Sequence, residues 1–298
     1  ISHSAIYCCQ RKITMKTALL CMPFIMIILL SACAQQKNPY TSPEGYDLNN
    51  PKKYLMPNVL NEISGIAFHT GNSDTIYAEQ DEEGKAYYMR PGDTKATHTK
   101  FSNNGDYEDM AICNNRVIML RSDGTLFTFP FSELGKPEAG NVRQWKSLLP
   151  PGEYEALYAD ENTHLLYTLC KQCKSDNKVG TTAGYVLQLT DSGTIQQQSN
   201  FTVDVTKNES PGTKKKFRFE PSALAKHPHS NEWFILSSVN KMLVIADSNW
   251  NVLQVHVLNP SLYNQPEGIA FDSNGVLYIS NEGGELKNGN VLAMAPGP

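Results

Sequence analysis

The stretch that decides the fold is Gln265-Pro-Glu-Gly-Ile-Ala-Phe-Asp272, followed by Gly275-Val-Leu-Tyr-Ile-Ser-Asn-Glu282. It predicts a short strand, a tight turn and a second strand. The same unit occurs five times, and its copies align on one position, which is occupied by Ser64, Glu108, Glu155, Ser222 and Glu267. The steps between copies are 44, 47, 67 and 45 residues. Such a period, with four short strands per unit, is typical of a β-propeller, in which each unit buries its apolar faces against its neighbours.

The repeat therefore predicts an all-β fold, a five-bladed propeller over residues 52–298. The last unit shows only three strands before the sequence ends at Pro298. We expect Tyr54–Leu60 to supply the missing outer strand and to close the ring, because closure removes an open sheet edge. The long third step carries two polar stretches, 171–182 and 207–216, which we interpret as surface insertions.

The N-terminal part has the organisation of an exported protein. Residues 1–14 have no pattern, and we interpret them as upstream translation before a start at Met15. Residues 15–32 combine Lys16 with an apolar run from Ala18 to Leu30, which predicts a signal peptide rather than a spanning helix. Residues 33–51 are polar and contain proline and glycine, so we expect a flexible tether that can be deleted without loss of folding.

The end of the signal peptide, Leu30-Ser-Ala-Cys33, resembles the lipobox of bacterial lipoproteins. The resemblance implies that Cys33 is lipidated after cleavage, so that the lipid anchor makes the contact with the membrane. The protein would then lie in the cell envelope, on the outer membrane, since no Asp follows Cys33. An ordinary signal peptide cleaved nearby is the alternative, and it also implies export.

The charge composition restricts the kinds of partner that we expect. The formal net charge is −4, and removal of residues 1–32 removes three basic residues and no acid. A mildly acidic body gives no basic surface for nucleic acid, so we expect no nucleic-acid partner. We expect a monomer that binds an unidentified small ligand or protein.

Acidic and hydroxyl side chains gather where the innermost strand of each blade begins. In a propeller these positions meet at one mouth of the central channel, together with the ends of the second strands. The first group is Glu62, Ser64, Asp106, Glu108, Glu153, Glu155, Glu220, Ser222 and Glu267. The second group is Glu79, Arg121, Lys171, Ser237 and Glu282.

Several carboxylates at one mouth require a positive partner. Ca²⁺ is one candidate, because it takes six to eight oxygen ligands in loose geometry. Glu108, Glu155 and Glu267 hold the same repeat position and form the best ligand set, and Ser64 and Ser222 could add hydroxyls. The alternative is neutralisation by ion pairs with Arg121 and Lys171.

The repeated starts Ile63-Ser-Gly-Ile-Ala-Phe68 and Glu267-Gly-Ile-Ala270, with the ending Leu277-Tyr-Ile-Ser-Asn-Glu282, resemble the SdiA-regulated family of bacterial β-propeller proteins. The resemblance covers about residues 52–298. It implies five blades and a calcium site near the axis, which we carry over only to Glu108, Glu155 and Glu267. Arg121 and Lys171 stand where other blades place an acid, and this departure leaves the number of protein ligands open.

Two functions follow from these patterns. The first is a lipoprotein that binds Ca²⁺ and a ligand or partner at the acidic mouth, without catalysis. The second is a calcium-dependent hydrolase of the lactonase or esterase kind, for which Asn240 and Asn281 stand at second-strand ends. Cys170 and Cys173 are expected to form a small disulfide or an inert pair, since a redox motif would open a helix.

Overall fold

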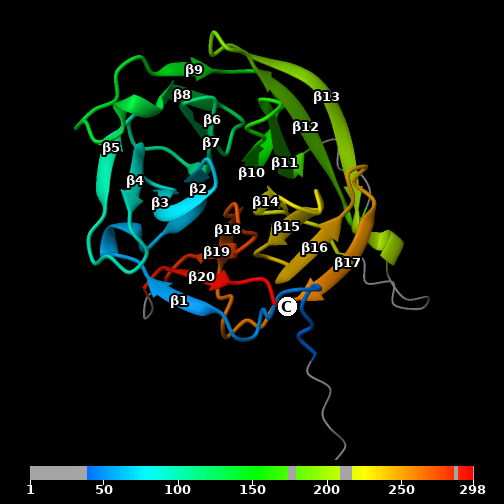
Figure 1. The fold of residues 1–298 in the computed structure, drawn as a ribbon. Coiled ribbons are helices and arrows are strands. Elements are labelled where there is room, and N and C mark those ends of the chain that lie inside the picture. Colours follow the sequence, from blue (N-terminus) through cyan, green and yellow to red (C-terminus); the bar gives the residue numbers. More distant parts are fainter. Residues whose placement is uncertain (1–38, 174–178, 209–216, 285–287, 298) are drawn as a thin grey trace, which may run out of the picture. The chain divides into compact units, whose positions relative to one another are not determined.

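The protein folds as a five-bladed β-propeller. The computed structural model describes residues 39–297, apart from 174–178, 209–216 and 285–287. Five four-stranded antiparallel sheets surround a common centre, as Figure 1 shows. The lipidation site predicted at Cys33, the signal peptide and residues 1–14 all lie outside the described residues. No helix among the described residues is long and apolar enough to cross a membrane.

The strands of each blade follow one another from the centre outward, so the blade order is the sequence order. Blade one consists of β2 (Ile63–His69), β3 (Asn72–Gln80), β4 (Lys85–Met89) and β5 (Thr97–Lys100). Blade two consists of β6 (Tyr107–Cys113), β7 (Arg116–Arg121), β8 (Leu126–Pro130) and β9 (Arg143–Trp145). Blade three consists of β10 (Gly152–Ala159), β11 (Leu165–Cys173), β12 (Thr181–Leu189) and β13 (Ile195–Asp204).

The last two blades complete the ring. Blade four consists of β14 (Ala223–Lys226), β15 (Trp233–Ser237), β16 (Met242–Ala246) and β17 (Val252–Val257). Blade five consists of β18 (Pro266–Phe271), β19 (Leu277–Asn281), β20 (Asn290–Met294) and β1 (Lys52–Leu55). The innermost strands are β2, β6, β10, β14 and β18, and each contacts the innermost strands of its two neighbours.

An N-terminal strand closes the ring, as predicted, but its bounds differ from the prediction. Strand β1 pairs antiparallel with β20, from Lys52 opposite Ala293 to Leu55 opposite Asn290. The expected strand Tyr54–Leu60 is therefore wrong beyond Met56, whose N–H donates to the Gly289 carbonyl at 2.9 Å. Pro57 has no N–H to continue the ladder, and Asn58–Leu60 forms a 3₁₀ turn instead.

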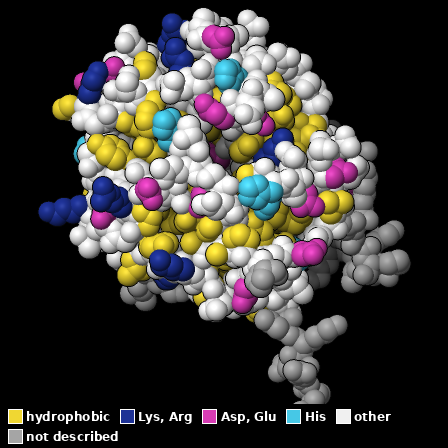
Figure 2. All heavy atoms as spheres, viewed as in Figure 1, with side chains coloured by type: hydrophobic (Ala, Val, Ile, Leu, Met, Phe, Trp, Pro, Cys, Tyr) yellow, Lys and Arg dark blue, Asp and Glu magenta, His cyan; other side chains and the backbone are white. Residues whose placement is uncertain are grey.

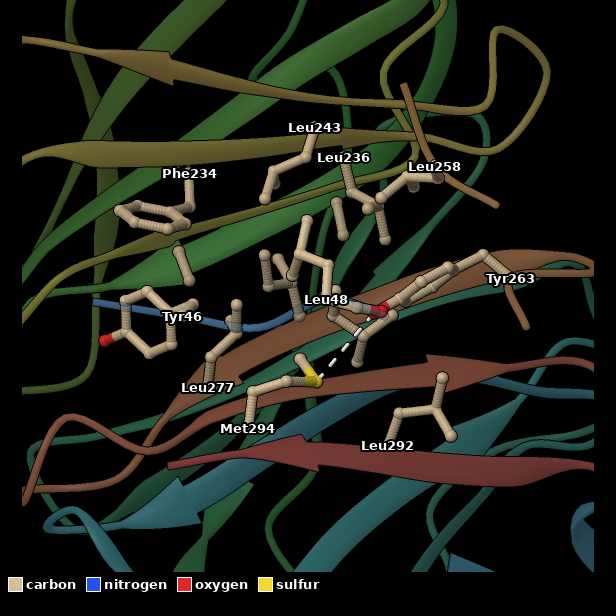
Figure 3. Packing of buried hydrophobic residues seen from close by; sticks show 14 of the residues in the cluster. Tyr46, Leu48, Phe234, Leu236, Leu243, Leu258, Tyr263, Leu277, Leu292 and Met294 are labelled. Atoms are coloured by element: carbon tan, nitrogen blue, oxygen red, sulfur yellow. Dashed lines mark hydrogen bonds between the residues drawn. The ribbon is translucent and has the colours of Figure 1, made fainter. Parts of the chain in front are cut away.

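The segment expected to be a flexible tether packs against blades four and five. Tyr46 and Leu48 are buried in the same apolar cluster as Phe234 and Leu277, as Figure 3 shows. The Tyr46 hydroxyl donates to the Gly275 carbonyl at 2.6 Å. The Tyr263 hydroxyl donates to the Leu48 carbonyl at 2.8 Å. We call residues 39–50 the N-terminal strap, because they join the propeller core before β1 begins.

The first of the two insertions predicted in blade three, residues 171–182, is shorter than expected. Strand β11 extends through Lys171 to Cys173, and β12 already begins at Thr181, so both ends of the stretch 171–182 belong to strands. Cys170 and Cys173 form a disulfide. Gly152 lies against both sulfurs: a Cβ there would come within 2.3 Å of Cys173 Sγ and 3.1 Å of Cys170 Sγ. The disulfide is therefore packed against the start of β10.

The apolar core lies between the blades. Five clusters of buried side chains each join two adjacent blades, so no blade buries its faces alone. Cys113 is a buried free thiol in the cluster between blades two and three, as expected for a small packing residue. In the view of Figure 2, acidic and basic side chains are interspersed over the ring face.

Candidate functional site

The acidic mouth of the channel lies where the innermost strands begin. Because β2, β6, β10 and β18 pair antiparallel with the strands that follow them, their first residues lie opposite the last residues of those strands. Ile63 lies opposite Gln80, Tyr107 opposite Arg121, and Pro266 opposite Asn281. The two groups of residues predicted from the sequence therefore share one end of the channel.

Three glutamates hold equivalent places at this mouth: Glu108 on β6, Glu155 on β10 and Glu267 on β18. The pKa of Glu108 is raised to about 9, mainly by burial and then by the charges of Glu155, Asp106 and Glu267, while the charge of Lys171 opposes the rise. Burial also raises the pKa of Glu267. The three carboxylates are thus close enough to act on one another, as their common repeat position predicts.

Lys171 forms an ion pair with one of these glutamates, and Lys241 acts electrostatically on Glu267. The partner of Lys171 is Glu155, and Lys171 Nζ also lies 3.4 Å from Glu153 Oε1. Burial lowers the pKa of Lys171, but Glu155 and Glu153 outweigh burial and raise it. Burial raises the pKa of Glu155 to about 8 even though Lys171 opposes this rise. One member of the glutamate set is therefore already paired with a lysine.

The second predicted cation points elsewhere. Arg121 Nη2 lies 2.7 Å from Asp123 Oδ2, and Nε lies 3.1 Å from Asp123 Oδ1. This two-point contact within one hairpin engages the guanidinium. Of the two ion pairs expected to neutralise the mouth, the structure contains the one with Lys171, whereas Arg121 pairs with Asp123.

Asp81 is an acid of this mouth that the sequence did not indicate, and it lies near Glu62 and Glu282 of the predicted groups. The pKa of Asp81 is raised to about 6, mainly by burial and then by the charge of Glu62. The pKa of Glu282 is raised to about 7, mainly by burial and then by the charges of Glu267 and Asp81. Asp81 directly follows the last residue of β3, so its place after a second strand was the available signal.

Several oxygens at this mouth have no hydrogen-bond partner in the part of the chain that is described. They are Glu79 Oε2, Asp81 Oδ1 and Asn281 Oδ1, and all three are buried. The other oxygen of Glu79 accepts the Gly65 N–H at 2.7 Å. Buried oxygens without partners are costly unless a donor or a cation satisfies them.

The hydroxyls of Ser222 and Ser280 bind the backbone of a neighbouring blade. Ser222 Oγ donates to the Pro266 carbonyl at 2.9 Å, and Ser280 Oγ donates to the Ser64 carbonyl at 2.6 Å. Both bonds join neighbouring blades. Asn240 is likewise engaged, since its Oδ1 accepts the Glu220 N–H at 3.1 Å and the Ser237 hydroxyl at 2.9 Å.

The carboxylates of the mouth are suitable ligands for a cation, but in their present arrangement they do not form a metal site. Over the described residues, no group of three or more His, Cys, Asp or Glu side chains converges tightly enough to hold a metal ion. Glu155 is turned to Lys171. Binding of Ca²⁺ by Glu108, Glu155 and Glu267 would therefore require Glu155 to leave Lys171 and the carboxylates to move together.

Comparisons with known proteins agree with the fold. Residues 186–285 match the family described as SdiA-regulated, which confirms the predicted resemblance over that stretch. No curated protein matches the chain. Among solved structures, glutaminyl cyclase from Myxococcus xanthus is 14% identical with a TM-score of 0.52, over 82% of this chain and 93% of its own.

Two further solved structures are similar at the same level. A luciferin-regenerating enzyme is 11% identical with a TM-score of 0.50, over 83% of this chain and 95% of its own. A glucose dehydrogenase is also 11% identical with a TM-score of 0.50, over 83% of this chain and 100% of its own. At such identities the likeness concerns the fold alone. The chain is thus a five-bladed β-propeller protein whose residues 186–285 match the SdiA-regulated family.

Proposed function

We propose that the protein is an exported lipoprotein whose propeller binds a divalent cation at its acidic mouth and uses this mouth to hold a ligand or partner. The single observation that carries the proposal is the gathering of buried carboxyl groups there. Glu108, Glu155 and Glu267 act on one another electrostatically, while Lys171 pairs with Glu155 and Lys241 acts on Glu267. Ca²⁺ suits this set because its ligands are carboxylate oxygens in flexible number and geometry.

The proposed ligands are Glu108 and Glu267, joined by Glu155 once it has left Lys171. Asp81 and Asn281 could complete the site, because each has a buried oxygen without a partner among the described residues. A bound cation would stabilise the ionised carboxylates and would lower their pKa values. The proposed role of the cation is to organise the mouth and to bridge to a ligand. The hydrolase alternative stays a prediction.

Membrane attachment is the second part of the proposal. It is supported by the sequence Leu30-Ser-Ala-Cys33 alone. Lipidation at Cys33 would leave residues 34–38 between the lipid and the N-terminal strap. The propeller would therefore be held close to the bilayer rather than at the end of a long tether.

The test of cation binding uses the exported body, residues 34–298, stripped of metal. Thermal unfolding is followed across a calcium titration. A cation that binds only the folded state adds about 2.7 kcal/mol at a hundredfold excess over its dissociation constant, so the melting temperature should rise. Glu155→Gln removes one ligand charge and should reduce the rise, whereas Glu138→Gln, an exposed acid outside the mouth, should leave it unchanged.

The alternative of pure ion pairing gives a different result. If Lys171 does all the neutralising, Glu155→Gln should destabilise the protein equally with and without calcium. A flat melting temperature for the wild type over the whole titration would reject the cation.

A further inference from the structure

The channel has a second opening, at the end opposite the acidic mouth. A cavity of about 320 Å³ lies there, lined by the far halves of all five innermost strands and by the turns that follow them. None of the three mouth glutamates lines it. Its volume lies near the lower limit of small-molecule sites, so it can take a small ligand.

The inner end of this cavity is apolar. The residue two places after the aligned repeat position is aliphatic in every blade and lines the cavity: Ile66, Met110, Leu157, Leu224 and Ile269. Each is buried, with 5% exposure or less. This ring stands between the cavity and the acidic mouth. The apolar ring therefore separates the acidic mouth from the cavity at the other end of the channel.

Two residues further along each innermost strand, one blade differs from the other four. Four blades have an apolar residue there, Phe68, Ile112, Ala159 or Phe271, and the fifth has Lys226 on β14. At this level of the innermost strands, a single lysine therefore stands among four apolar residues. The repeat alone would put an aliphatic or aromatic side chain at this position.

The Lys226 ammonium has one loose ion pair, with Asp160, and lies 5.8 Å from the centroid of the Trp233 ring. Its Nζ lies 3.5 Å from Asp160 Oδ2, longer than the 2.7–2.9 Å typical of a charge-assisted bond. Asp160 is held by its own turn, since its Oδ1 accepts the N–H groups of Asn162 and Thr163 at 3.0 Å each. Within the described part of the chain, Asp160 is the one hydrogen-bond partner of this ammonium. The ammonium thus keeps donors for a further acceptor.

The other ionisable groups of the wall are engaged within the fold. Asp272 accepts the Ser73 hydroxyl at 2.8 Å and the N–H groups of Asn274 and Val276 at 2.9 Å. His227 Nδ1 accepts two backbone N–H groups of the following turn, at 3.2 and 3.0 Å, and its Nε2 lies 2.8 Å from the Tyr46 hydroxyl. Glu161 is exposed and accepts the Asn114 N–H at 3.1 Å.

We propose that this cavity binds a small anionic amphiphile, with one carboxylate on Lys226 and an apolar body against the aliphatic ring. The carboxylate would accept from the free donors of the ammonium. The body would lie between the aliphatic ring and the flanking Phe68 and Phe271. This site is separate from the cation site and does not rest on it.

The probe is octanoate, titrated calorimetrically into residues 34–298. Octanol, with the same body and no charge, and octylamine, with the opposite charge, are the comparison ligands. Octanoate should bind saturably at one site per chain and more tightly than both. Lys226→Met should weaken octanoate binding about tenfold or more, as expected for loss of a bond to a charged group, and should remove the preference over octanol.

Three further variants keep the test decisive. Lys226→Arg retains the charge and should retain octanoate binding, whereas Ala159→Trp fills the cavity and should abolish it. Lys136→Met removes a lysine outside the cavity and should change nothing. The calcium response of the melting temperature should survive in Lys226→Met, which separates this proposal from the cation site. Equal binding of octanoate by Lys226→Met and the wild type, or tighter binding of octylamine, would overturn it.

Discussion

At the scale of single residues, the acidic mouth makes stability depend on pH. Burial raises the pKa of Glu108 to about 9 and that of Glu155 to about 8, both above the value of about 4.3 for an unfolded glutamate. Between these values the folded state binds more protons than the unfolded state, so the free energy of unfolding falls as pH rises. We therefore expect the metal-free protein to lose stability from about pH 5 to about pH 9.

Glu108→Gln provides the check, because glutamine mimics the protonated acid. Denaturant unfolding at several pH values should show a shallower loss of stability above pH 7 for this variant than for the wild type. Glu138→Gln, outside the mouth, should follow the wild type. A wild-type stability that rises between pH 7 and pH 9 would contradict the burial of these acids.

The protons on the buried carboxyl groups of the mouth also make calcium binding depend on pH. A cation that binds ionised carboxylates must displace the proton that Glu108 holds near neutrality, since the pKa of Glu108 is raised to about 9. Calcium affinity should therefore increase with pH from 6 to 9. Titration calorimetry in buffers of different ionisation enthalpy should detect protons released on binding, and binding without proton release would contradict the assignment of these ligands.

At the scale of elements, the N-terminal strap should contribute to stability. Leu48 is 2% exposed within the cluster between blades four and five (Figure 3). Leu48→Ala should lower the free energy of unfolding by about 2–5 kcal/mol, as expected for a buried leucine. Deletion of residues 34–50 should destabilise the protein as well, contrary to the tether predicted from the sequence.

The matched control is Glu44→Gln, an exposed substitution in the same segment, which should leave denaturant unfolding unchanged. A Leu48→Ala variant as stable as the wild type would show that the strap packs only weakly.

Sequence patterns could predict the blades but not every contact. The repeat predicted the innermost strands and the common position of Glu108, Glu155 and Glu267, because every blade repeats the same succession of backbone strands. It could not predict the burial of Tyr46 and Leu48, since two apolar residues in a polar segment show no periodicity. The alternative in which Arg121 neutralises an acid of the mouth is wrong, because Asp123, two residues away in the hairpin, reaches Arg121 with less loss of side-chain entropy than a more distant acid.

At the scale of the whole molecule, the proposed lipid anchor at Cys33 lies outside the described residues and is tested in cells. Cys33→Ala in the full precursor should prevent lipidation and release the protein from membranes. Fractionation of cells that produce the wild type or the variant gives the comparison. A variant that stays in the membrane fraction would contradict lipidation at Cys33.

The most direct test of the cation site is a crystal structure of residues 34–298, stripped of metal and then saturated with Ca²⁺. We expect one anomalous peak at the acidic mouth, with oxygens of Glu108 and Glu267 at about 2.3–2.6 Å. We also expect that Glu155 has left Lys171 to join them. A mouth without a peak, in which Lys171 still pairs with Glu155 at saturating calcium, would contradict the proposed cation site.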